Sequence, residues 1–434
     1  DNNTALGRSA LALNTTGTNN TSVGAYSLDA NTTGSNNTAV GYSALSSITT
    51  GTQCVAVGRE ALFNNTANNN TAVGFKAMIS TTTGDDNTAI GSQTLEANTT
   101  GEYNTAIGHQ ALEANTSANN NTAVGYQALN TNTTGTQNVA VGSNALDANV
   151  THSRNTAVGY NSLSANVTND NTCLGANTMP SSTSAYDNVA IGSETLQDLT
   201  TGINNVAVGR IALGDNTTGQ NNTGIGYLAL RLNTTANNNT ALGKSALSAN
   251  TTASGNTAVG SDCLSSNTTG GGNAAFARQA LQNNTTGSNN SSLGNASLFT
   301  NTTGASNVAC GIFAMYYNTT GSLNTAIGRD ALLNNTTGGG NIGVGFNSGN
   351  NITTGDNNIV VANQGTASSA TVDNEITLGN SSNTSLRCNT QTISSLSDAR
   401  DKTNVIDLPE GLDFVTKLRP VKFEWATRDG NGKD

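Results

Sequence analysis

Residues 19–34 read NNTSVGAYSLDANTTG, and residues 36–51 read NNTAVGYSALSSITTG. Both stretches run from an Asn-Asn-Thr start, through a Val-Gly step and a leucine, to a Thr-Thr-Gly end. Similar stretches recur along most of the 434-residue chain. Repetition at a short fixed period is typical of architectures in which each repeat is one unit that stacks on its neighbours. The repeat therefore predicts a stacked, elongated fold rather than several globular domains.

The glycine of the Val-Gly step, here called the marker glycine, measures the period. It recurs at 23 positions from Gly7 to Gly379, with Ala277 and Ala362 replacing it in two coils. Of the 22 intervals, 20 are 17 residues long and two are 16, namely 58–74 and 159–175. Both shortened coils are expected to lose their residue in the Asn-Thr-Thr-Gly turn, which leaves the strands aligned.

Other positions keep the same register. Asn stands four residues before the marker in 21 of 23 coils, and Leu or Met stands four residues after it in the first 20 coils. The Thr-Ala-Val step predicts a short strand with one face inside, and the segment around the leucine predicts a second short extended piece. Glycines mark positive φ or a close approach of two coils. We therefore expect an all-β fold, a parallel β-solenoid (β-roll) of about 23 coils.

Composition supports stacking and excludes other classes of protein. Charged residues make up 10% of the chain and aromatic residues 4%, with a net charge of −10. Stacked like charges repel, whereas Asn and Thr bond to their own copies above and below, as in side-chain ladders. The chain has no basic stripe of the kind that would predict nucleic-acid binding. It also has no apolar run that reaches the ~18 residues of a membrane helix.

One thin coil buries little apolar area, so lateral association is expected. Rows of Ala and Tyr are predicted to face partner chains, with tyrosines at Tyr42, Tyr126, Tyr160 and Tyr227. The repeat resembles the left-handed β-rolls in the heads of trimeric autotransporter adhesins, whose coils carry a [Val/Ile]-Ala-[Ile/Val]-Gly step. That resemblance implies a homotrimer of rolls.

The composition changes near residue 397. Residues 397–434 hold 7 Lys+Arg and 8 Asp+Glu, two of the three prolines and the only tryptophan. Leu412, Val415 and Leu418 follow helical spacing, and Val421 to Trp425 follows as a strand after Pro420. This segment predicts the start of an α+β module that differs from the repeat.

LSDARDKTNV (396–405) and LRPVKFEW (418–425) resemble the start of the endosialidase-type intramolecular chaperone of phage tail fibres and tailspikes. The resemblance implies a module that trimerises, drives assembly of the stalk and then cuts itself off between Leu396 and Ser397. In this chain it implies Ser397 as nucleophile and Lys402 as its partner, with Asp398 and Arg400 supporting them. A serine needs a neighbouring base, and burial lowers a lysine pKa enough to supply one.

These patterns divide the chain into a repeat shaft (1–379), a connector (380–396) and the N-terminal part of the chaperone (397–434). The family's module is longer, and the chain begins inside a repeat, so we expect a longer protein. Five scattered cysteines, together with His109 and His152 in turns, indicate no metal site and no cofactor. No substrate-directed activity is expected, and the one enzymatic activity that the resemblance implies is self-cleavage between Leu396 and Ser397.

The prediction for function is structural: a phage tail fibre shaft, located in the virion, that attaches to a glycan or protein receptor on the host surface. A bacterial surface adhesin or extracellular fibre is the alternative. An ice-binding solenoid is a remote one, because the threonines lie mostly in turns. A glycan depolymerase needs paired carboxylates in a cleft, and residues 1–396 show no clustered acids.

Overall fold

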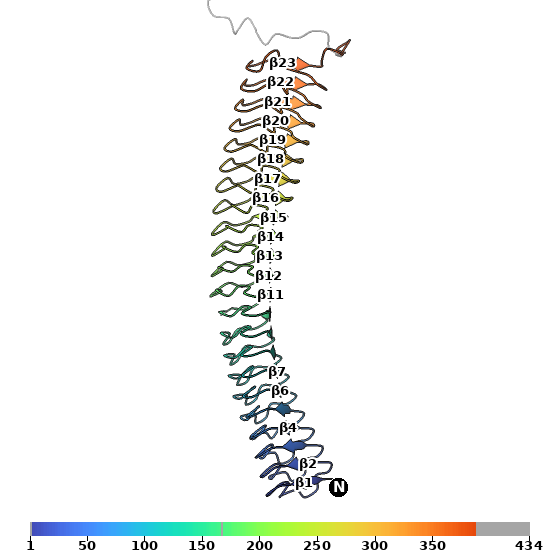
Figure 1. Ribbon diagram of the computed structural model, residues 1–434, viewed down its shortest axis with the longest axis vertical. Coiled ribbons are helices and arrows are strands. Elements are labelled where there is room, and N and C mark those ends of the chain that lie inside the picture. The colour runs from blue at the N-terminus through green and yellow to red at the C-terminus, as the bar shows by residue number, and fades with distance from the viewer. Residues whose placement is uncertain (1, 166–167, 388–434) are drawn as a thin grey trace, which may run out of the picture. The chain divides into compact units, whose positions relative to one another are not determined.

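Each repeat forms one coil with a single three-residue strand, and the strands stack in sequence order along residues 1–382 (Figure 1). A computed structural model describes residues 2–165 and 168–387 of the chain. The strands are β1 (Thr4–Leu6), β2 (Thr21–Val23), β3 (Thr38–Val40), β4 (Val55–Val57), β5 (Thr71–Val73), β6 (Thr88–Ile90), β7 (Thr105–Ile107), β8 (Thr122–Val124), β9 (Val139–Val141), β10 (Thr156–Val158), β11 (Thr172–Leu174), β12 (Val189–Ile191), β13 (Val206–Val208), β14 (Thr223–Ile225), β15 (Thr240–Leu242), β16 (Thr257–Val259), β17 (Ala274–Phe276), β18 (Ser291–Leu293), β19 (Val308–Cys310), β20 (Thr325–Ile327), β21 (Ile342–Val344), β22 (Ile359–Val361) and β23 (Ile376–Leu378). No helix occurs in these described ranges, so the predicted parallel β-solenoid is confirmed.

Every strand pairs in parallel with the strand of the next coil, at the same position of the repeat. Thr21 of β2 pairs with Thr38 of β3, for example, 17 residues on. The two short coils keep this register, because Val55 pairs with Thr71 across 16 residues, and β10 pairs with β11 in the same way. The 17-residue period is confirmed, and both shortened intervals are absorbed outside the strands.

The first short coil loses its residue in the turn, as predicted. In a full coil, the Asn31 side-chain amide donates to the Gly34 carbonyl, three residues on, at 3.0 Å. In the short coil, Asn65 makes the corresponding bond to the Ala67 carbonyl, two residues on, also at 3.0 Å. The turn therefore closes with the same hydrogen bond in both coil lengths.

The core is a narrow file of alanines and leucines. In the third coil, Ala39 in the middle of β3 is fully buried, and so are Ala44 and Leu45 after the marker glycine. The prediction that alanine rows face partner chains is therefore wrong. Successive strand residues point to opposite faces, and the alanine methyl group fits inside a coil whose core also holds a leucine. Val360 takes the inward position of β22, where Gly349 replaces that leucine.

The segment around the leucine is not the second extended piece that was predicted. It is a run of turns in which Ser43 and Leu45 have positive φ values of 51° and 53°. The Ser43 N–H donates back to Ala25 at 3.0 Å, whereas the Leu45 N–H donates forward to Ala61 at 3.0 Å. A left-handed residue costs about 1–2 kcal/mol, which burial of the whole leucine side chain, worth a similar amount or more, offsets.

Asparagines form the predicted ladder on the inside of the coil. The Asn222 side-chain oxygen accepts the backbone N–H of Asn239 at 3.1 Å. The Asn222 side-chain amide donates to Asn205 Oδ1 at 3.2 Å and to the Ala236 carbonyl at 2.8 Å. Each fully buried side chain thus satisfies the backbone of its own coil and of the next one.

A second asparagine ladder runs along the turns, seven residues after each marker glycine. Asn250 donates to Asn233 Oδ1 at 3.0 Å, and Asn267 donates to Asn250 Oδ1 at 3.0 Å. Ile48 interrupts this ladder, and the buried Oδ1 of Asn31 in the coil before it has no hydrogen-bond partner. The ladder therefore tolerates an apolar rung at the cost of one unsatisfied acceptor.

Candidate functional site

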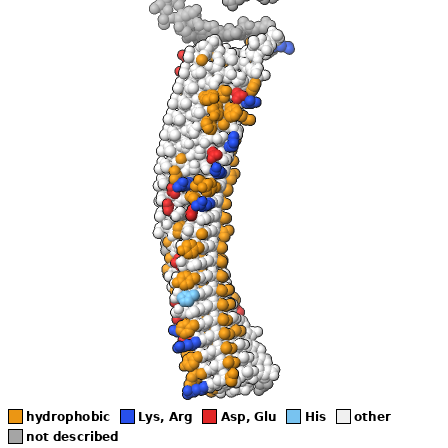
Figure 2. Space-filling model, viewed as in Figure 1, with side chains coloured by type: hydrophobic (Ala, Val, Ile, Leu, Met, Phe, Trp, Pro, Cys, Tyr) orange, Lys and Arg blue, Asp and Glu red, His pale blue; other side chains and the backbone are white. Residues whose placement is uncertain are grey.

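The outward face of the strands carries a file of apolar side chains along the described solenoid. Because the middle strand residue points inward, the first and third residues point outward. The third residue of each strand, one position before the marker glycine, is Val, Ile, Leu or Phe in 22 of 23 coils. We call this file the outer row; its exposed members include Leu6, Ile90, Ile107, Leu174, Leu242, Phe276, Leu293, Ile327, Val361 and Leu378. Hydrophobic side chains form files along the solenoid in Figure 2.

The outer row is regular because the strand stack is regular. Ile90 is 40% exposed and Ile107 37% exposed, and the two side chains occupy paired positions in β6 and β7. Neighbouring strands lie ~4.8 Å apart, so one apolar side chain follows another along the whole stack. An extended exposed apolar surface of this kind marks an interaction site.

A second file, the residue directly after each marker glycine, carries aromatic and cationic side chains. Tyr42, Tyr126, Tyr160 and Tyr227 belong to it and are all about half exposed. Their predicted contact with partner chains stays a prediction. The Arg59 guanidinium lies 5.9 Å from the Tyr42 ring centroid and 5.8 Å from that of Phe75. Cation–π attraction therefore links this file from one coil to the next.

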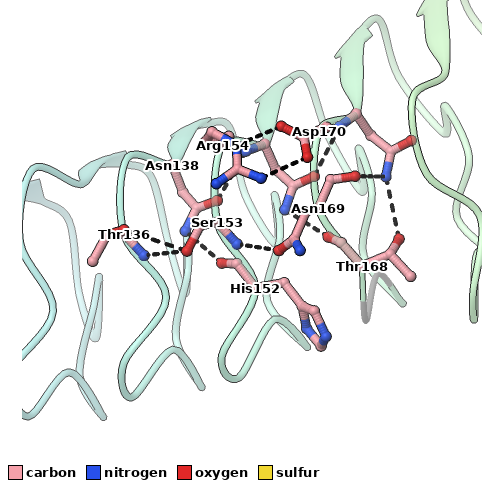
Figure 3. Close-up of polar contacts among 10 residues, drawn as sticks. Thr136, Asn138, His152, Ser153, Arg154, Thr168, Asn169 and Asp170 are labelled. Atoms are coloured by element: carbon pink, nitrogen blue, oxygen red, sulfur yellow. Dashed lines mark hydrogen bonds and ion pairs between the residues drawn. The ribbon is translucent and has the colours of Figure 1, made fainter.

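Polar contacts carry the stack across the second short coil (Figure 3). The Thr136 N–H donates to Ser153 Oγ at 2.9 Å, and the Ser153 N–H donates to Asn169 Oδ1 at 2.7 Å. Beside them, Arg154 Nε and Nη2 donate to the two carboxylate oxygens of Asp170 at 2.6 and 2.7 Å. These contacts join three consecutive coils where the repeat is one residue short.

His152 stands in the same region, at the turn position that most coils give to glycine or alanine (Figure 3). Its backbone carbonyl accepts the side-chain amides of Asn138 at 2.9 Å and Asn149 at 3.0 Å. Its ring nitrogen Nδ1 is buried without a hydrogen-bond partner. Desolvation by burial lowers the pKa of the His152 imidazole below its ordinary value.

Acidification is expected to destabilise this part of the solenoid through His152. Because the pKa is lower in the folded chain, the unfolded chain binds the proton more readily, and stability falls as pH drops from about 7 to about 5. Thermal unfolding followed by circular dichroism measures the change. His152→Gly restores the usual turn residue and should reduce the pH dependence in this range. An unchanged pH profile in that variant would contradict the assignment.

The residues predicted for self-cleavage, Ser397, Asp398, Arg400 and Lys402, lie outside the described residues, as does the predicted helix at 412–418. Of the predicted turn residues, His109 stacks on the Tyr126 ring, with centroids 5.7 Å apart. In the described ranges, no three His, Cys, Asp or Glu side chains group as metal ligands would. Those ranges also hold no helix of the length and apolarity that a bilayer crossing needs.

The cysteines of the described coils replace ordinary repeat residues. Cys54 takes the place of a ladder asparagine, and Cys263 takes the place of a core alanine. Burial raises the pKa of the Cys54 thiol to about 11 and that of the Cys263 thiol to about 12. Both thiols therefore stay protonated near neutral pH and act as small core side chains.

Comparison with known protein families finds a match to a family described as chaperone of endosialidase. Residues 397–434 match the chaperone of endosialidase family. The resemblance carried by LSDARDKTNV and LRPVKFEW is thereby confirmed. No curated protein matches the chain, and no solved structure does either. The likeness of the repeat to adhesin β-rolls therefore stays a prediction.

The endosialidase chaperone match and the solenoid together fit a structural protein of the tail-fibre type. Sequence reasoning found the chaperone segment from its charged and aromatic residues, but it did not identify the outer row as the exposed one. The sequence carried the signal, because Val, Ile or Leu follows the much smaller Ala in most strands. Only the smaller residue fits inside a coil that also holds a leucine.

Proposed function

We propose that this chain is the shaft of a phage tail fibre, in which three copies associate side by side through the outer row. The observation that carries the proposal is the exposed apolar file on the strands from β1 to β23, in a chain that also carries an endosialidase chaperone segment. The chain has a shaft at 1–379, a connector at 380–396 and the chaperone segment at 397–434. The shaft attaches the virion to a glycan or protein receptor of the host surface.

The trimer follows from the geometry of a single coil. Each coil contributes only a few buried side chains, mainly two alanines and one leucine as in Ala39, Ala44 and Leu45. A chain this thin leaves its strands open on the outer side. Packing three outer rows against one another removes these side chains from water, at about 25 cal/mol per Å² of apolar surface buried. Closed symmetric association also limits growth to a defined assembly.

Charge on the outer row is expected to dissociate the assembly. Replacing both Ile90 and Ile107 with lysine places two charges within the apolar file, where burial without a partner is costly. Sedimentation of the unaltered protein should give three times the chain mass, and the double variant should shift toward single chains. Leu232→Lys is the control, because Leu232 has the same 37% exposure as Ile107 but lies outside the outer row. A single-chain mass for the unaltered protein would overturn the trimer.

The chaperone segment is proposed to release itself after assembly. The Ser397 hydroxyl attacks the carbonyl carbon of Leu396, and Lys402 accepts its proton. The amide nitrogen of Ser397 leaves as an amine that takes up a proton, and water then hydrolyses the new ester. Asp398 and Arg400 position the pair. The family match at residues 397–434 supports this assignment.

Mass spectrometry tests the self-cleavage. The unaltered chain is expected to yield a fragment that ends at Leu396, and both Ser397→Ala and Lys402→Ala should stay intact. Ser395→Ala is the control and should be cleaved like the unaltered chain. Cleavage that persists in Ser397→Ala, or an intact C-terminus in every protein, would rule the mechanism out. Detection of the chain in purified virions checks the proposed location.

A further inference from the structure

A hollow of about 540 Å³ opens on the surface of the second to fifth coils. Its lining residues are Tyr26, Asp29, Tyr42, Ser43, Ser46, Glu60, Phe63 and Ile79. All but Tyr42 stand two or five residues after a marker glycine. The volume lies in the range of about 300–1,000 Å³ that is typical of small-molecule sites.

The hollow exists because the third coil has small residues on both sides. Side chains two and five residues after the marker glycine face each other across a shallow groove on the surface. In the sixth coil they fill it, since Gln93 Nε2 donates to Glu96 Oε2 at 2.9 Å. In the third coil these positions are Ser43 and Ser46, which leave the space between their larger neighbours open.

Two carboxylates in the hollow are held by hydrogen bonds, and each still has one oxygen that can accept a hydrogen bond from a ligand. The Ser46 hydroxyl donates to Asp29 Oδ1 at 2.6 Å. Arg59 Nε and Nη2 donate to Glu60 Oε1 at 3.1 and 2.9 Å. In the described part of the chain, these bonds use one oxygen of each carboxylate, so Asp29 Oδ2 and Glu60 Oε2 remain for the hydroxyl or ammonium groups of a ligand. Positioning before binding lowers the entropic cost of binding.

Aromatic rings complete the site. Tyr26 and Tyr42 meet edge to face, with centroids 5.9 Å apart, and Tyr42 is 50% exposed. Phe63 lines the same hollow. An exposed aromatic face packs on the C–H face of a sugar ring, and neighbouring carboxylates accept its hydroxyl groups. Arg59 is already paired with Glu60, so the groups that the hollow still offers are carboxylate oxygens. These oxygens accept hydrogen bonds from hydroxyl or amino groups and do not suit an acidic sugar.

We propose that this hollow binds one neutral or amino-sugar unit of a surface glycan. This inference rests on the proposed role of the chain in host attachment and specifies the chemical class of the receptor. A site of this composition lies on the second to fifth coils of the described solenoid. Three sites in a trimer would strengthen attachment through multivalency.

Calorimetric titration of the full chain with three probes tests the proposal. The probes are chitotriose as a neutral sugar, its de-acetylated trisaccharide as an amino sugar, and sialyllactose as an acidic sugar. At least one of the first two should bind more tightly than sialyllactose. Tyr42→Ala removes the exposed ring, and Ser46→Leu fills the hollow; each should weaken binding by about ten-fold or more. Tyr126→Ala, in the same file five coils away from Tyr42, is the control and should bind normally.

Failure of binding to chitotriose and its de-acetylated form, preference for sialyllactose, or normal binding by both Tyr42→Ala and Ser46→Leu would overturn the sugar site. Attachment of labelled full chain to host cells separates this failure from failure of the fibre assignment. If the unaltered chain and Ser46→Leu attach equally, the sugar site is wrong and the fibre role stands. If purified virions lack the chain, the fibre role is wrong and the titration still decides the sugar site.

Discussion

Asn222→Leu is expected to lower the free energy of unfolding of the central solenoid by about 3–5 kcal/mol. The leucine has the same number of side-chain heavy atoms and the same branching, but it cannot accept the Asn239 N–H or donate to the Ala236 carbonyl. It also removes the side-chain donor to Asn205 Oδ1. Each buried polar group left without a partner costs about 1–3 kcal/mol. Guanidinium unfolding followed by circular dichroism measures the loss.

Gln220→Leu provides the matched control for this ladder variant. Gln220 is two residues away and exposed, and its replacement by leucine should change stability by no more than about 0.5 kcal/mol. Hydrogen exchange locates the effect, because coils near Asn222 should lose protection before distant coils do. Equal stability of the two variants would show that the asparagine ladder does not hold the coils together.

Gly226→Val is expected to lower the free energy of unfolding at least as much as Asn222→Leu does. The cause here is a steric clash and not the loss of hydrogen bonds. Gly226 has φ of +136°, and a Cβ at this position would lie 2.4 Å from the carbonyl oxygen of Gly243 in the next coil. A β-branched residue is strongly disfavoured at such a φ, and the obstacle is backbone that is itself bonded into the stack. We expect a loss of about 4 kcal/mol or more, among the largest single-site effects.

Two other positions of the chain, Ala277 and Gly255, show how much space and which φ values a substitution for glycine needs. Ala277 occupies the marker position of its coil at φ of +110°, so one methyl group is accommodated where the backbone shifts. Valine adds two carbons that no such shift clears. Gly255 is the control glycine, because its φ is +72° and a Cβ there would meet nothing within 4 Å. Gly255→Asn should leave the stability unchanged. If Gly226→Val unfolds at the same guanidinium concentration as the unaltered protein, the steric argument is wrong.

The period, the parallel register and the asparagine ladder were predictable, because the same residue types recur at fixed positions of the repeat. The inward direction of the asparagines was not part of that prediction. The deletion in the turn near Asn65 was predictable for the same reason, since the strand residues around it keep their identities. The left-handed φ of Leu45 was not predictable, because leucine disfavours that conformation in isolation. Bonds from neighbouring coils impose it, and a single repeat carries no sign of them.

The candidate sites also divide into those that the sequence predicts and those that it does not. The family match confirms the chaperone segment that was predicted around Ser397, and the cleavage roles of Ser397 and Lys402 stay predictions. The hollow at Ser43 and Ser46 was not predictable, because it depends on which residues face each other across a turn. Sequence reasoning found no clustered acids, yet Asp29 and Glu60 line one hollow from different coils.

The asparagine ladder has a further consequence for the reach of the molecule. Coils that keep their ladder asparagines present the same donors and acceptors on their two sides, so removing one complete unit among them, such as residues 223–239, would join surfaces that already match. Reach can then be altered in increments of ~4.8 Å without designing a new contact. Duplication or loss of whole repeats can therefore change the length of the solenoid without changing the residues that bind a receptor.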